Sequence, residues 1–327
     1  MNRWFSSSYI EKSAIFLQDE EGVVTFNGIR CPKTDQQVYF SRNDKRLVEA
    51  CKGIFCWTKE EYEFYKANSS NNYVWLTGNH RTSKLVKDDL RKSFHSEIET
   101  LNKDYGKVIL FCSTFAQGLG SKGEFAKPKL AAEAEAEKYP AAIKWAYDEW
   151  RVHSHLAFFS FLDFVRLFIG SELKEEFKLV FRPHPSESSD FYRYLLQNID
   201  FVEVDDRFSI EPWLEKSKIV IGSNCTTLVE AAVYGKPAIS FLPRIGSKID
   251  CVLKNLVPAR FSLLAHSPDE LSNHIKQLRS NTNCFSKKIE NFHKSAKSFV
   301  GLPSDWRFIQ AREILKYCPH TDFPRAI

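Results

Sequence analysis

Short runs of apolar and β-branched residues alternate with longer helical patterns along most of the chain. Apolar runs bounded by polar turns are typical of buried strands, and apolar positions three and four apart are typical of helices. Their alternation predicts an α/β fold with parallel sheets. The predicted strands are 14–17, 53–57, 73–76, 107–112, 178–181, 201–204, 218–221 and 238–242, and the predicted helices are 44–50, 59–67, 88–102, 129–137, 141–169, 190–198, 210–216, 226–234, 268–279 and 305–317.

A polar segment at 77–83, followed by a charged helical pattern, separates two groups of predicted strands. We therefore expect one domain at 1–102 and a second at 103–327, with a helical insertion near 128–170 in the second. The first domain has three clear strands and the second has five. Three strands are few for a doubly wound sheet, so the first domain is expected to be incomplete at its start.

Composition adds limits on the class of protein. The chain has 327 residues, of which 43% are hydrophobic and 27% charged, a balance typical of a folded globular protein. The net charge of +5 is spread along the length, which argues against a nucleic-acid partner. The eight cysteines include no C-x-x-C pair, so we expect free thiols, no disulfide framework and no metal site.

The longest apolar stretch, 156–169, has only fourteen residues and includes Asp163 and Arg166. A membrane span needs about 18 uncharged apolar residues, so this stretch predicts a buried helix. The N-terminus also lacks the apolar core of a signal peptide. We expect a cytoplasmic protein, with peripheral association with the inner face of the membrane left open.

The strongest local motif is Arg182-Pro183-His184-Pro185, which follows the predicted strand 178–181. Two prolines fix the backbone around an imidazole at the carboxyl end of a strand, where open α/β sheets bind ligands. The alternative is a proline-rich turn whose histidine only faces solvent. A loop that begins at Thr114, after strand 107–112, is a weaker candidate for a ligand-facing segment.

A second motif at 218–237 is predicted to run from a strand through a hydroxyl-rich loop into a helix that ends at a glycine. Its polar residues are Ser223, Asn224, Thr226 and Thr227. Free N–H groups at a helix start bind phosphate, and hydroxyl groups add further donors. Each Ser or Thr alone is better explained as a helix cap, whereas the whole motif favours the phosphate site. Glu230 lies one turn into the helix, where its carboxylate either reaches ribose hydroxyls or faces solvent.

A third motif is acidic. Glu20 and Glu21 follow the first predicted strand and precede a glycine. Neighbouring carboxylates raise one another's proton affinity, which suits a general base. An exposed acidic turn explains the same run.

Together these motifs resemble those of bacterial GT-B glycosyltransferases that use CMP-activated acidic sugars. These are the sialyltransferase-like and Kdo-transferase-like groups, which carry a D/E-D/E-G, an HP and a Ser/Thr motif. The closest likeness is to the surface carbohydrate (polysaccharide) biosynthesis proteins. It rests on segments 55–57, 77–81, 104–107 and, most specifically, 182–187, and it covers residues 14–300.

The resemblance implies a GT-B-like fold, with two Rossmann-like domains that face a cleft. It also implies an inverting, metal-independent glycosyltransferase that moves an acidic sugar from a CMP-sugar, its donor substrate, to a surface polysaccharide or a lipid-linked glycan precursor, without a separate cofactor. Glu20 would be the base, with Glu21 the second candidate. The donor would be held by Arg182, His184, Ser223, Asn224, Thr226, Thr227 and, at the ribose, Glu230.

Two alternatives stay open. One is a polyol-phosphate transferase of the CDP-glycerol type, which is also a GT-B protein with a histidine at its phosphate site. The other is a non-catalytic, truncated remnant that acts as a binding or partner protein, as the short first domain suggests.

Overall fold

The computed structural model describes residues 16–17, 29–31, 36–38, 51–68, 73–78, 82, 85, 89–115, 141–280, 283–300 and 312. The chain divides into two compact units. Unit 1 consists of Met1–Asn27, Phe40–Ser83 and Lys297–Ile327, and unit 2 of Gly28–Tyr39 and Lys84–Ala296. The units thus change at Ser83 and Lys84, whereas the sequence led us to expect a boundary near residue 103.

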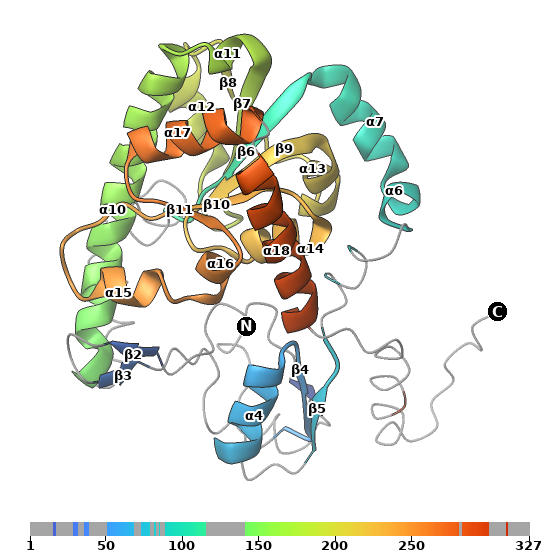
Figure 1. Cartoon of the computed structure of the whole chain (residues 1–327), viewed down its shortest axis with the longest axis vertical. Coiled ribbons are helices and arrows are strands. Elements are labelled where there is room, and N and C mark those ends of the chain that lie inside the picture. Colours follow the sequence, from blue (N-terminus) through green and yellow to red (C-terminus); the bar gives the residue numbers. More distant parts are fainter. Residues whose placement is uncertain are drawn as a thin grey trace. The chain divides into compact units, whose positions relative to one another are not determined.

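Unit 2 contains a six-stranded parallel sheet (Figure 1). Its strands run in the order β11-β10-β9-β6-β7-β8. With β6 counted as the first strand, this is the order 3-2-1-4-5-6 of a Rossmann-type sheet, read from the other edge. The strands are β6 (Lys107–Cys112), β7 (Phe177–Arg182), β8 (Val202–Val204), β9 (Ser217–Gly222), β10 (Ala238–Phe241) and β11 (Leu263–Ala265).

Helices of unit 2 cover the two faces of this sheet (Figure 1). Alternate strand residues, among them Ile109, Leu179 and Ile221, pack into one core with apolar side chains of α10 and α17. The described helices are α6 (Asp89–Ser93), α7 (His95–Asp104), α10 (Ala141–Ile169), α11 (Leu173–Glu176), α12 (Ser189–Leu196), α13 (Ile210–Lys216), α14 (Thr226–Tyr234), α15 (Ile249–Leu253), α16 (Val257–Arg260), α17 (Pro268–Arg279) and α18 (Asn283–Val300), which continues beyond unit 2. An antiparallel pair, β2 (Ile29–Cys31) and β3 (Gln36–Val38), also belongs to unit 2.

Aromatic side chains hold α10 and α12 to the sheet. The Phe161 ring lies 4.5 Å from that of Phe111 and 4.7 Å from that of Phe181, which in turn lies 4.6 Å from Tyr192, centroid to centroid. Tilted ring pairs at these distances add to the free energy of burial. The stretch Asp148–Ile169 of α10 is long and apolar enough to cross a membrane, but half of its most apolar window is buried inside the protein. The predicted helix at 156–169 is confirmed, and Phe161, Phe164 and Phe168 on one face of it are fully buried.

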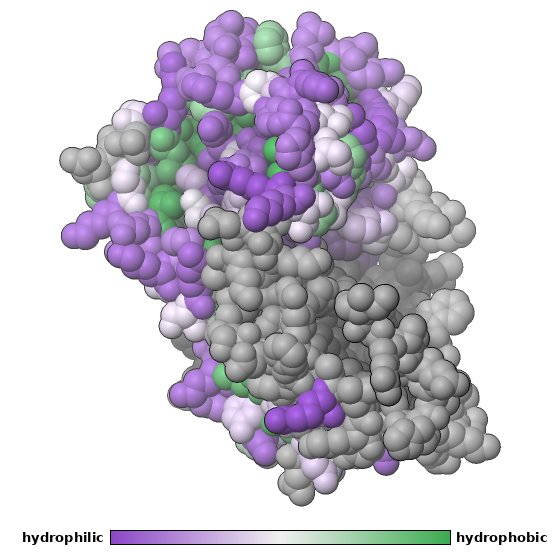
Figure 2. All heavy atoms as spheres, turned by 90° about the vertical axis from the view of Figure 1, so that its right-hand side faces the viewer, coloured by the Kyte–Doolittle hydropathy of each residue, from purple (hydrophilic) through white to green (hydrophobic). Residues whose placement is uncertain are grey.

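The described surface is mainly hydrophilic in the view of Figure 2, with apolar side chains in small groups. Large exposed apolar residues include Val152 and Phe159 on α10 and Tyr194 and Leu195 on α12. Scattered apolar residues of this kind are normal on a folded protein.

Unit 1 contains a parallel sheet of β1 (Phe16–Leu17), β4 (Gly53–Cys56) and β5 (Val74–Leu76), with β4 in the centre, and the helix α4 (Lys59–Asn68). Thr58 and Glu61 cap the start of α4 with contacts that resemble a capping box. The Glu61 N–H donates to Thr58 Oγ1 (3.1 Å), and Glu61 Oε2 accepts the Trp57 N–H (2.5 Å).

The α/β class with parallel sheets is therefore confirmed. The structure divides the predicted helix 88–102 into α6 and α7. Among the described residues it adds elements that the apolar pattern did not predict, namely β2, β3, β11, α11, α15, α16 and α18. The predicted helices at 44–50 and 129–137, and all of 305–317 except residue 312, lie outside the described residues.

Candidate functional site

The order in which the chain adds strands to the sheet of unit 2 reverses between β6 and β9. From β6 the chain proceeds to β7 and β8 on one side, and it then returns to continue with β9, β10 and β11 on the other. Open α/β sheets bind ligands at such a switch point, outside the carboxyl ends of the strands. The segments after β6, β7 and β9 are 113–115, 183–187 and 223–225. These segments form the candidate site.

His184 lies two residues beyond the end of β7 and is partly buried. Its Nδ1 accepts the Ser186 N–H (3.2 Å) and lies 2.7 Å from Ser186 Oγ. A ring nitrogen that accepts a backbone N–H carries no proton, so in the neutral imidazole the proton is on Nε2. The backbone turn is closed by the Glu187 N–H, which donates to the His184 carbonyl (2.8 Å). His184 thus presents a fixed ring whose Nε2–H is a hydrogen-bond donor.

The loop between β9 and α14 is tightly turned. A Cβ on Gly222 would lie 2.7 Å from Cys225 Sγ, so the close approach of the loop to the strand end requires glycine. Asn224 has a φ of 57°, in the left-handed region. Helix α14 begins at Thr226, with Cys225 at the N-cap position and no hydrogen bond from a capping side chain. The interpretation of Ser223, Thr226 or Thr227 as the helix cap is therefore not supported.

The side chains of this loop are sheltered from solvent. Ser223 and Asn224 are each 6% exposed, and neither polar atom of the Asn224 amide has a hydrogen-bond partner. Burial raises the pKa of the Cys225 thiol to about 11, so the thiol is neutral at physiological pH. Glu230 is 1% exposed, which excludes the alternative that its carboxylate faces solvent. An unpaired buried amide beside an uncapped helix start is a costly arrangement that a polar ligand would relieve.

The end of β6 connects the two predicted motifs. Ser113 Oγ accepts the His184 N–H (3.0 Å), and Thr114 Oγ1 donates to the Ser223 carbonyl (2.5 Å). Neighbouring strands lie about 4.8 Å apart, so β7 and β9, one on each side of β6, are about 10 Å apart. Two adjacent residues directly after β6 thus connect the histidine turn to the loop before α14.

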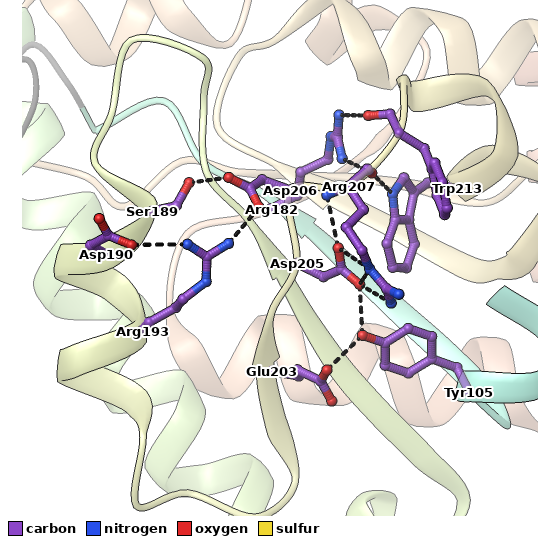
Figure 3. Close-up of polar contacts among 11 residues, drawn as sticks. Tyr105, Arg182, Ser189, Asp190, Arg193, Glu203, Asp205, Asp206, Arg207 and Trp213 are labelled. Atoms are coloured by element: carbon purple, nitrogen blue, oxygen red, sulfur yellow. Dashed lines mark hydrogen bonds and ion pairs between the residues drawn. The ribbon is translucent and has the colours of Figure 1, made fainter. Parts of the chain in front are cut away.

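Arg182 lies at the end of β7, but its side chain is turned toward the loop that follows β8 (Figure 3). Its guanidinium donates to the carbonyl oxygens of Arg207 (3.0 Å) and Phe208 (2.7 Å). Phe208 has a φ of 64°, which is unfavourable for a residue with a side chain. The observed contacts of Arg182 therefore stabilise a strained loop. Its role at the donor stays a prediction.

The same loop is fixed by a second set of polar contacts (Figure 3). The carboxylate of Asp205, 3% exposed, accepts hydrogen bonds from Arg207 Nε (2.9 Å) and Nη2 (2.6 Å). The Tyr105 hydroxyl lies 2.8 Å from both Asp205 Oδ2 and Glu203 Oε1. Burial and these two carboxylates raise the pKa of Tyr105, so the phenol stays protonated and donates. The pKa of Arg207 is also raised, chiefly by its hydrogen bond with Asp205. This network stabilises the loop through contacts within the protein.

The structure places seven predicted donor-site residues on unit 2, after or within neighbouring elements of its sheet. Glu20 and Glu21, the predicted base and its alternative, lie outside the described residues. The sequence did not predict that Ser113 contacts the histidine turn, or that Glu187 accepts several hydrogen bonds. The signal available for Ser113 was its position, directly after an apolar strand. Within the described ranges, no group of three or more His, Cys, Asp or Glu residues is arranged to hold a metal ion.

No protein-family model matches the chain, and no curated protein matches it. Among solved structures it is similar to the wall teichoic acid polymerase TagF, with 14% identity and a TM-score of 0.51 over 90% of this chain and 65% of that one. A histidine-to-alanine variant of TagF aligns with 15% identity and a TM-score of 0.55 over 90% and 66%. A histidine-to-asparagine variant of TagF soaked with CDPG aligns with 14% identity and a TM-score of 0.51 over 90% and 62%.

These similarities establish the fold as α/β and GT-B-like, as the sequence resemblance implied. The chain spans about two thirds of the length of the TagF chains that it matches.

Proposed function

We propose that the chain is a transferase that takes a cytidine-nucleotide-activated donor and transfers the activated group to a surface polymer or its lipid-linked precursor. The observation that carries this proposal is a pair of hydrogen bonds at the switch point of a Rossmann-type sheet: Ser113 Oγ accepts the His184 N–H, and Thr114 Oγ1 donates to the Ser223 carbonyl. Together they link the histidine turn to the loop before α14. The fold shared with TagF supports the same class of reaction.

The phosphate of the nucleotide would lie between His184 and the start of α14. His184 Nε2–H donates to one phosphate oxygen, and the N–H groups of Thr226 and Thr227 donate to others with the favourable end of the helix dipole behind them. Ser223 and the unpaired amide of Asn224 supply further polar contacts, and the buried Glu230 takes the ribose hydroxyls. The unpaired Asn224 amide supports this assignment because a bound polar ligand would satisfy it.

The chain's contribution to chemistry would be stabilisation of the leaving nucleotide. An acceptor hydroxyl forms a new bond to the transferred group while the bond between that group and the CMP phosphate oxygen breaks. The electron pair of that bond goes to the CMP oxygen, where negative charge develops. Donors fixed in advance around that charge lower the barrier. The hydroxyl proton goes to a base, for which Glu20, and after it Glu21, stay the predicted residues.

Two donor classes fit this scheme, and both release CMP. The TagF structures, one of them soaked with CDPG, favour a CDP-polyol of the CDP-glycerol type, in which the acceptor attacks the phosphorus distal to the cytidine. The motif resemblance favours a CMP-linked acidic sugar, in which attack inverts the anomeric carbon. Both reactions use donors made in the cytoplasm and acceptors at the membrane, and we assign the protein to that interface.

The test is CMP release. The purified chain is incubated with CDP-glycerol or with a CMP-linked acidic sugar, with and without a lipid-linked glycan or polymer acceptor. We expect acceptor-dependent CMP release from one donor class, reduced by at least about 100-fold in His184→Ala, since a group that stabilises developing charge is commonly worth that much. Release that is unchanged in His184→Ala would contradict the proposed site. Tight CMP binding with no release from either donor would instead indicate a non-catalytic binding protein.

A further inference from the structure

Glu187 carries a buried carboxylate at the heart of the candidate site. It lies three residues after His184 and is 8% exposed. Oε2 accepts the hydroxyl groups of Ser113 (2.5 Å) and Tyr192 (2.9 Å), and Oε1 accepts the Phe115 N–H (2.5 Å). A buried carboxylate is stable only when donors compensate its lost hydration, and these three do so.

The carboxylate fixes the direction of the hydrogen bonds that reach His184. A carboxylate only accepts, so the single proton of the Ser113 hydroxyl must point to Glu187. The Ser113 lone pairs then remain available for the His184 N–H, which they accept at 3.0 Å. The order is therefore His184 N–H to Ser113 O–H to Glu187, and hydrogen bonds in such a chain polarise and strengthen one another.

The same carboxylate fixes the end of β6 on both sides of Thr114, because its other acceptor oxygen takes the Phe115 N–H. Thr114 holds the Ser223 carbonyl, directly before Asn224 and α14. Glu187 thus has contacts that extend through Ser113 to the histidine turn and through residues 113–115 to the start of α14.

We infer that Glu187 is a positioning residue, which holds His184 and the loop at 223–225 at the separation that a nucleotide phosphate requires. It acts through Ser113 and Thr114 and does not itself contact the donor. The inference deepens the proposed function and rests on it for the identity of the ligand. The separation that Glu187 maintains between His184 and the loop at 223–225 is a property of the free protein and is measurable without any ligand.

The variant Glu187→Gln tests the inference, because the amide keeps the size of the side chain and presents an NH₂ group where an acceptor is needed. The matched control is Glu149→Gln on α10, where Oε2 accepts Ser247 Oγ (2.7 Å) and the Ile249 N–H (2.9 Å). Both variants lose a carboxylate with more than one donor within unit 2. Glu187 bonds to the segment after β6 and to Tyr192, whereas Glu149 bonds to Ser247 and Ile249.

Two measurements are made on wild type and both variants, after their melting temperatures are compared. The first is hydrogen exchange by mass spectrometry without ligand. In Glu187→Gln we expect faster exchange in peptides that cover 182–188 and 221–228, and in Glu149→Gln only in peptides that cover 245–253. The second is the dissociation constant for CMP and for CDP by calorimetry. We expect at least about tenfold weaker binding in Glu187→Gln, since displacement by about 1 Å is costly at such sites.

Unchanged exchange at both 182–188 and 221–228 in Glu187→Gln would overturn the inference. So would faster exchange of the same two segments in Glu149→Gln, because the effect would then reflect general loss of stability. Equal affinity of wild type and Glu187→Gln for CMP and CDP would also overturn it. If wild type binds neither nucleotide, the proposed function fails, and the exchange data alone decide whether Glu187 positions His184 and the loop at 223–225.

Discussion

A buried histidine on α10 is expected to make unit 2 sensitive to acid. His153 is 2% exposed, and its Nε2 has no hydrogen-bond partner. Burial lowers the pKa of the imidazole from 6.5 to about 4, against a smaller opposing effect of Asp250. The folded protein therefore holds His153 neutral at a pH where the unfolded chain protonates it.

The sign and size follow from proton linkage. Between pH 6.5 and 4 the unfolded state binds more protons, so the free energy of unfolding falls as the pH falls through this window. A pKa shift of this size corresponds to a loss of about 3 kcal/mol by pH 4, at about 1.4 kcal/mol per pH unit. That is a large share of the stability of an ordinary domain. Above pH 6.5 the contribution is fully present.

The assay is urea unfolding of wild type and His153→Leu at several pH values from 4 to 8. Carboxylates titrate in both proteins, so the difference between their pH profiles isolates the imidazole. We expect the leucine variant to lose less stability on acidification, by about the amount above, and to differ little from wild type in slope above pH 7. Parallel profiles from pH 8 to 4 would refute the assignment of His153 as a buried neutral histidine.

Three further changes test the packing of unit 2. Gly222→Ala is expected to lower the stability by about 1–3 kcal/mol in urea unfolding, because its Cβ would lie 2.7 Å from Cys225 Sγ, and Cys225→Ala in the same chain is expected to restore part of the loss. Asp205→Asn is expected to cost about 1–3 kcal/mol by the same measurement, because it weakens the hydrogen bonds to Arg207; no loss would show that the network is not stabilising. Phe161→Ala is expected to cost about 3–5 kcal/mol, since the ring is fully buried, and a loss below about 1 kcal/mol would contradict the packing described.

Local sequence was sufficient to predict most of the sheet and the positions of the two main motifs. The predicted strands 107–112, 178–181, 218–221 and 238–242 coincide with β6, β7, β9 and β10, and the histidine turn and the loop at 223–225 follow β7 and β9 as expected. Strand β11 was not predicted, although β5 and β8, which also have three residues each, were.

Local sequence could not predict the hydrogen-bond partner of each polar side chain. Ser113 meets Glu187 because β6 is inserted between β7 and β9, and that strand order is a property of the whole sheet. Arg182 was expected at the donor because it adjoins His184, yet its observed partners are carbonyl groups of the loop after β8. Strand order and side-chain direction depend on contacts between residues far apart in sequence, which spacing along the chain does not record.

The most direct test of the account is the binding of CMP and CDP to the full chain, measured by calorimetry on wild type and His184→Ala, with Glu149→Gln as the control. The account predicts that wild type and Glu149→Gln bind at least one of the two nucleotides with equal affinity. It predicts that His184→Ala binds at least about tenfold more weakly, because a hydrogen bond to a charged phosphate is lost. Equal affinity in His184→Ala, or no binding of either nucleotide by wild type, would contradict the assignment of a nucleotide-phosphate site at the β6–β9 switch point.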